Sequence, residues 1–76
     1  MIRELDVVVL TAAIPEEGLE PGDVGTVVHA YPDGQAFEVE FMTVDGNTVA
    51  VATVETSHVR PVGDREITHA REMAAR

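Results

Sequence analysis

The sequence predicts a mainly β fold, a small five-stranded barrel with a short C-terminal α-helix. Short apolar runs are separated by turn signals, and one of these runs alternates strictly between apolar and acidic residues. A chain of 76 residues makes one domain, and a domain of this size buries only about 60% of the surface that its unfolded chain exposes. We expect the barrel over residues 1–62 and a helix or tail over residues 63–76.

The first strand is expected at Asp6–Leu10, where a β-branched run is too short for a helix and suits a strand buried on both faces. The stretch that follows, Thr11–Gly22, contains two prolines and two glycines. These residues fix or free the backbone against regular structure, so we expect a long ordered loop that tucks Ile14 and Leu19 inward.

The second and third strands are expected at Gly25–Ala30 and Ala36–Phe41, joined as a hairpin by the turn of sequence YPDGQ. Pro32 presets the backbone of this turn and Gly34 accepts the left-handed conformation. The glycines of the preceding GDVG stretch are interpreted in the same way, as residues that let the chain bend into a strand.

The third strand carries the clearest pattern in the chain. Phe37, Val39 and Phe41 fall on one face and Glu38 and Glu40 on the other. A period of two is typical of a sheet with one face in the core and one in water, so the two carboxylates are expected on a solvated face.

A turn at Val44–Thr48 leads to a fourth strand at Val49–Val54. One helical turn at Glu55–His58 then precedes a brief closing strand at Val59–Val62. Five short strands, with a long loop after the first and a helical turn before the last, follow the order of an SH3-like barrel. Closure is expected because an open sheet this small would leave edges that aggregate.

The last stretch predicts a helix, with Asp64 as its N-cap and an apolar stripe of Ile67, Ala70, Met73 and Ala74. The stripe is thin, and an isolated helix of about twelve residues is marginal in water. Such a helix docks on the barrel, docks on a partner, or frays.

The motifs IPEEGL, GDVGTVV, Y-x-x-G, EVEF and VRPV occur in this order within residues 6–62. Their combination resembles the small bacterial proteins grouped as domain of unknown function 4926. The resemblance implies an SH3-like fold and assigns no catalytic residue. A looser similarity connects the same motifs to the SH3-like domain of nitrile hydratase beta subunits and to KOW-type ribosomal and transcription-factor modules, and fold does not fix function.

Charge is distributed unevenly along the chain, whose formal net charge is -9 and which contains no lysine. Residues 4–59 contain no basic residue except histidine, whereas four of the five arginines lie at positions 60, 65, 71 and 76. An acidic body repels phosphate backbones, so no nucleic-acid partner is expected, whereas a basic protein partner is favoured. Alternatively, the acidity reflects a GC-rich or salt-adapted genome.

Residues that could carry chemistry are few. The neighbours of the glycines in the GxxG stretch are the acidic residues Glu20 and Asp23, which disfavour a phosphate loop. The three histidines lack metal-site spacing, and the chain has no cysteine. Glu38 and Glu40 lack the pocket that acid/base chemistry needs. Too few aromatic residues are available for a proline-rich peptide groove, and Ser57 adjoins His58 too closely to form a nucleophile and base pair.

The sequence therefore predicts a non-catalytic, acidic protein-interaction module, with an antitoxin or inhibitor of a basic toxin as its sharper form. The alternatives are an accessory or metallochaperone-like subunit resembling nitrile hydratase beta, and a KOW-like RNA or ribosome-associated module. No catalytic, metal or cofactor residue is predicted, and a homo-oligomer remains open. The absence of a signal peptide or an apolar membrane span favours the cytoplasm. The candidate partner-binding residues are Tyr31, Glu38, Glu40, Ile67, Arg71 and Met73.

Overall fold

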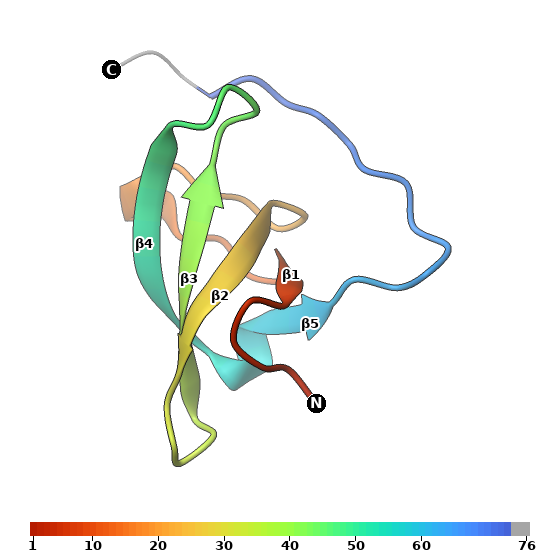
Figure 1. The fold of residues 1–76 in the computed structure, drawn as a ribbon. Coiled ribbons are helices and arrows are strands. Elements are labelled where there is room, and N and C mark those ends of the chain that lie inside the picture. Colours follow the sequence, from red (N-terminus) through yellow and green to blue (C-terminus); the bar gives the residue numbers. More distant parts are fainter. Residues whose placement is uncertain (74–76) are drawn as a thin grey trace.

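Five strands form one antiparallel sheet in the computed structural model, which describes residues 1–73 (Figure 1). The strand order is β4-β3-β2-β1-β5, and two short 3-10 helices, η1 and η2, lie in the connections. The predicted mainly β class is confirmed. The elements are β1 (Val7–Leu10), η1 (Pro15–Glu17), β2 (Val24–Ala30), β3 (Ala36–Met42), β4 (Thr48–Glu55), η2 (Thr56–His58) and β5 (Val59–Pro61).

The hairpin between β2 and β3 has the predicted turn. The Tyr31 N–H donates to the Ala36 carbonyl at 3.2 Å, and the Gly34 N–H donates to the Tyr31 carbonyl at 3.0 Å. The Asp33 carboxylate accepts a hydrogen bond from the Gln35 N–H at 3.0 Å, as expected for an aspartate that stabilises its own turn. The pairing shifts register between Val27 and His29, which is a β-bulge in β2.

Every strand contributes apolar side chains to one hydrophobic core. The five strands belong to one sheet, and the sheet curls around the core that their apolar side chains form. The alternation predicted for β3 is confirmed, since its three apolar side chains are buried and its two glutamates are not. The buried core residues are Val8, Leu10, Leu19, Val27, Phe37, Val39, Phe41, Ala50, Ala52, Val54 and Val59.

Gly25 lies where β2 presses against β3. A Cβ atom built on Gly25 would come within 2.6 Å of Val39 Cγ1 and 2.9 Å of both the Glu40 carbonyl oxygen and Phe41 Cδ1. Gly25 is therefore required for close packing rather than for a bend. The bend lies at Gly22, whose φ of 96° is in the left-handed region, so the turn predicted from the GDVG stretch is confirmed at that glycine.

The C-terminal helix prediction is wrong for the described part of the tail, because residues 62–73 contain no helix. The Glu66 carboxylate accepts hydrogen bonds from the Arg60 guanidinium and from the Gly63 N–H, which fold Gly63–Glu66 into a turn instead of a first helical turn. Ile67 is 94% exposed, whereas Ala70 and Met73 line the groove, so the predicted stripe does not form one face of the tail. Ala74, the last member of the predicted stripe, lies outside the described residues.

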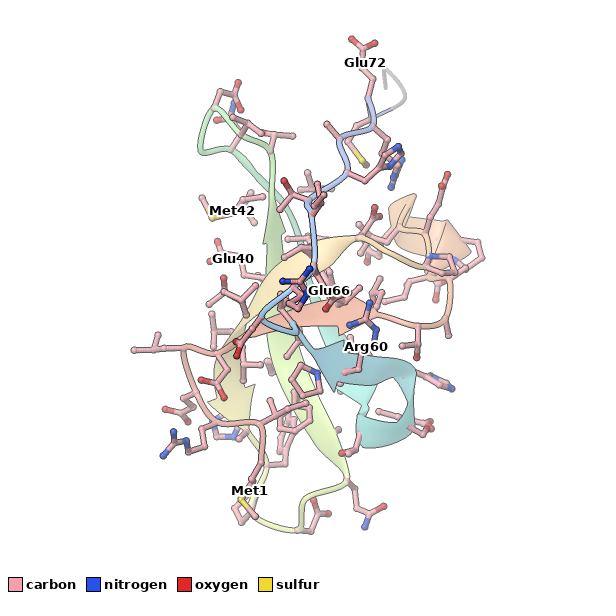
Figure 2. The ribbon with its side chains drawn as sticks, turned by 90° about the vertical axis from the view of Figure 1, so that its right-hand side faces the viewer. Met1, Glu40, Met42, Arg60, Glu66 and Glu72 are labelled. Carbon is pink, nitrogen blue, oxygen red and sulfur yellow. The ribbon has the colours of Figure 1, made fainter. Side chains whose placement is uncertain are left out.

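The tail, defined as residues 62–73, leaves β5 and returns toward the end of the molecule where β3 and β4 are joined (Figure 1). Figure 2, viewed from the right-hand side of Figure 1, shows it crossing in front of β1 and β2. The tail therefore runs beside β1 and β2, and its residues 68–73 line the same groove as Leu19 and Phe41 of the hydrophobic core.

Candidate interaction surface

The outer face of the sheet carries the two glutamates of β3. The Glu38 carboxylate accepts hydrogen bonds from the Tyr31 hydroxyl and from the Thr53 hydroxyl, each at 2.5 Å. Thr53 is the residue of β4 that pairs with Glu38, and His29 pairs with Glu38 from β2. Cross-strand pairing thus assembles this cluster from three strands.

Glu40 is held in a similar way one step further along β3. Its carboxylate accepts a hydrogen bond from the Thr48 hydroxyl at 2.6 Å. Its direct neighbours across the sheet are Thr26 on β2 and Val51 on β4. The two carboxylates are therefore anchored by threonine hydroxyls, and neither of them is neutralised by an arginine in the described part of the chain.

Hydrogen bonding keeps the Glu38 carboxylate charged. The Thr53 hydroxyl, and after it the Tyr31 hydroxyl, lower the pKa of Glu38 because they stabilise the ionised form. The same contact raises the pKa of Tyr31, since loss of the phenol proton would place a second negative charge beside the first. The face consequently presents negative charge throughout the neutral pH range.

Exposed apolar side chains surround the two glutamates. Val51 lies directly opposite Glu40 and is 53% exposed, and Met42 follows Glu40 on the same face of β3 and is 50% exposed. Val24 and Val28 of β2 are also exposed. Figure 2 shows Glu40 and Met42 side by side on this face. A surface of this kind combines charge for orientation with apolar area for affinity.

A groove of about 560 Å³ lies between the tail and the body of the protein, at the end of the sheet next to Met42. On the side of the body it is lined mainly by core-side residues and their neighbours, namely Leu19, Val24, Phe41, Met42 and Val49. Its other side is lined by residues 68–73. We define the acidic outer face as the solvent side of β2, β3 and β4 that carries the two glutamates, and the groove adjoins this face at Met42 and Val24.

The side chain of Arg71 lines the groove and binds the loop between β1 and β2. Its Nε donates to Asp23 Oδ1 at 2.8 Å and its Nη2 donates to Asp23 Oδ2 at 2.5 Å. The Gly18 carbonyl accepts a further hydrogen bond from Nη2 at 2.9 Å. The hydrogen bonds from Arg71 lower the pKa of Asp23, and those contacts raise the pKa of Arg71.

The six predicted partner-binding residues fall into three groups. Tyr31 and Glu38 touch each other, and Glu40 lies next along the same strand. Arg71 and Met73 line the groove and contact the body of the protein, so they are not presented on a helix as expected. Ile67 is exposed and does not line the groove.

Sequence reasoning missed the roles of Asp23, Thr48 and Thr53. It treated Asp23 only as a residue unfavourable to phosphate, whereas the structure pairs it with Arg71, 48 positions away along the chain. The two threonines could have been found from the strand pattern, since a hairpin register places β4 residues opposite those of β3. The ion pair carries no such local signal.

The histidines do not converge on a common site. The His29 ring packs edge-on against the Tyr31 ring, with centroids 4.8 Å apart, and its Nδ1 lies 3.5 Å from Glu4. His58 ends η2, and His69 lines the groove. Among residues 1–73, no three His, Cys, Asp or Glu side chains gather closely enough to hold a metal ion.

Comparison with known proteins identifies the class to which this curled, acidic sheet belongs. Residues 4–61 match the family described as Domain of unknown function (DUF4926). The chain belongs to this family, because the match covers all five strands. No curated protein and no solved structure matches the chain. Within the described residues, no helix is long and apolar enough to cross a membrane.

Proposed function

We propose that this chain is a non-catalytic, SH3-like interaction module whose acidic outer face binds a basic segment of a partner protein. The strand order and the single curled sheet support the SH3-like assignment. The acidic outer face supports the binding role. An antitoxin or inhibitor that covers the basic surface of another protein is one form that this function takes.

The observation that carries the proposal is the fixed, charged state of Glu38 and Glu40. Their carboxylates are anchored by hydroxyl groups across the sheet, so they lose little side-chain freedom when a ligand binds. They remain without an arginine partner in the described part of the chain, in a protein whose net charge is -9. A basic ligand therefore meets preorganised charge rather than charge that is already compensated.

The apolar surroundings support a protein ligand over a small ion. Val51 and Met42 adjoin Glu40 and are about half exposed. Such side chains favour a ligand that has apolar parts as well as positive charge, which describes a basic stretch of polypeptide.

The test is co-purification of the full tagged chain from its source organism. The double variant E38Q/E40Q keeps the shape of both side chains and removes two charges. We expect the wild-type chain to retain a stoichiometric basic protein that elutes at raised salt, and the double variant to lose at least nine tenths of it.

E16Q/E17Q is the matched control, because it removes the same charge from helix η1, none of whose residues is buried, and leaves both glutamates of β3 in place. This control is expected to retain the partner. Equal retention by E38Q/E40Q and wild type would contradict the proposal, as would a wild-type chain that purifies alone.

A further inference from the structure

The loop between β1 and β2 binds the guanidinium of Arg71 as a complete arginine site. The two carboxylate oxygens of Asp23 accept two N–H groups, the Gly18 carbonyl accepts another, and Glu20 Oε2 lies 3.7 Å from Nη1. Paired carboxylate contacts of this kind match the planar fork of arginine and do not suit lysine. Asp23 is 16% exposed and Arg71 is 26% exposed, so the pair is partly shielded from water.

The loop's own hydrogen bonds hold this site independently of the tail. The Asp23 carboxylate also accepts a hydrogen bond from the Glu20 N–H at 2.8 Å, which fixes its orientation. Ile14 and Leu19 exchange backbone hydrogen bonds at 3.0 and 3.1 Å, and the Gly22 N–H donates to the Leu10 carbonyl at 2.8 Å. The arginine site is thus a property of the body of the protein.

The tail, in contrast, occupies its place loosely. It has no helix within the described residues, and the groove of about 560 Å³ remains between it and the sheet. Only Arg71 and Met73 among residues 67–73 are half buried, whereas the others are exposed. The Met73 side chain reaches Gly18. Its Cε lies 3.5 Å from the place that a Cβ atom would occupy if residue 18 had a side chain.

We infer that the Asp23 site and the adjoining groove dock an arginine-bearing segment of the partner protein, and that Arg71 of the tail occupies this site in competition with it. The occupant is an extended basic segment with an apolar residue two positions after the arginine, as in Arg71-Glu72-Met73. This inference rests on the proposed function, because the groove adjoins the acidic outer face at Met42, next to Glu40 (Figure 2).

Competition follows from the chemistry of the exchange. A partner arginine would replace Arg71 and form the same hydrogen bonds, so the exchange itself contributes no binding free energy. A tethered group competes at an effective concentration of roughly millimolar. A partner must therefore add contacts of its own, which the apolar lining of the groove and Glu40, beside Met42 (Figure 2), are placed to supply. The tail then selects against short arginine-bearing ligands that lack these contacts.

The test is an NMR titration of the full chain with a capped heptapeptide of sequence ITHAREM, which copies residues 67–73. The R71Q variant empties the arginine site and leaves the loop intact. We expect the peptide to shift the backbone amides of Gly18, Gly22 and Asp23 in R71Q, with an affinity about fivefold or more above that for wild type.

R65Q is the matched control, because Arg65 carries the same charge in the tail and forms no ion pair or hydrogen bond within residues 1–73. It is expected to bind the peptide as weakly as the wild type does. The double variant R71Q/D23N is expected to lose the binding, and so is the peptide in which glutamine replaces arginine. The chemical-shift dispersion of backbone amides in the core, such as that of Val39, verifies that each variant is folded.

Equal peptide affinities for R71Q and R65Q, or shifts that survive D23N, would overturn the inference and leave the Arg71 contact as a structural one. A wild-type chain that dimerises by exchanging tails would assign the site to a second copy instead. Failure of the proposed function gives a different result, in which E38Q/E40Q still retains the partner while the dependence of peptide binding on Asp23 persists.

Discussion

The sheet and the tail of this protein are held in place by different forces. The sheet surrounds a core of apolar side chains, and among residues 1–73 no polar or charged side chain is buried. The tail is attached mainly by two arginine–carboxylate contacts, Arg60 with Glu66 and Arg71 with Asp23. Apolar burial is insensitive to pH and is spread over many contacts, whereas these pairs are few, short-ranged and titratable. We therefore expect the tail to detach under conditions that leave the sheet folded.

The largest effect is expected where the sheet has no spare room. The substitution Gly25→Ala places a methyl group against Val39 and against the Glu40 backbone, which cannot move aside as a side-chain end can. We expect a loss of about 3 kcal/mol in the free energy of unfolding, the upper part of the usual range for overpacking. Urea denaturation of the variant and of the wild type measures this difference in the free energy of unfolding.

Gly63→Ala is the control in the tail. Its added methyl group would meet only the flexible Glu66 side chain at 3.4 Å, and its backbone is not in the left-handed region. A change within about 0.5 kcal/mol is expected. Equal losses for the two variants would show that the sheet and the tail are not separate in stability.

Acid should release the tail before it unfolds the sheet. Hydrogen bonds from Arg60, and then from the Gly63 N–H, lower the pKa of Glu66 from 4.5 to about 2, and those from Arg71 lower the pKa of Asp23 below 3.8. Both pKa values are depressed in the folded state, so the stabilisation is complete above about pH 4.5 and is lost as the pH falls toward 2.

NMR spectra recorded across this pH range separate the two regions. The Gly63 amide and the Arg71 side-chain Nε–H report on the tail, whereas the Val39 amide reports on the sheet. We expect the first two signals to change at a higher pH than the third. A single transition shared by all three would contradict the prediction.

The smallest effect concerns the acidic outer face. Thr53→Val retains the β-branched shape and removes the hydroxyl that contributes most to the lowered pKa of Glu38. The pKa of Glu38 is expected to rise toward its ordinary value of 4.5. NMR titration of the Glu38 carboxyl carbon measures the shift. Thr48→Val is the control, because its hydroxyl donates to Glu40 instead and its loss should leave Glu38 unchanged.

The same contrast explains how far the sequence could predict the structure. The alternation along β3 and the turn residues around Gly34 are local signals, and the strand and the turn that they predict were confirmed. The surface position of Glu38 and Glu40 followed from the same alternation.

The tail could not be predicted in this way. A thin stripe on a short helix carries only a weak preference for helix, and the tail instead takes a turn closed by Glu66 and an extended course that brings Arg71 to Asp23. The partner of Arg71 lies 48 positions away, beyond the reach of any periodicity. The arginine site consequently became visible only in three dimensions.

Tyr31 is the only tyrosine of a chain that has no tryptophan. Nearly all of the near-ultraviolet emission of the protein therefore arises from one ring, which stacks edge-on with His29 and donates a hydrogen bond to Glu38 on the acidic outer face. The molecule carries its own unlabelled optical reporter at the surface where a partner is proposed to bind, and the rest of the fold contributes almost no background to it.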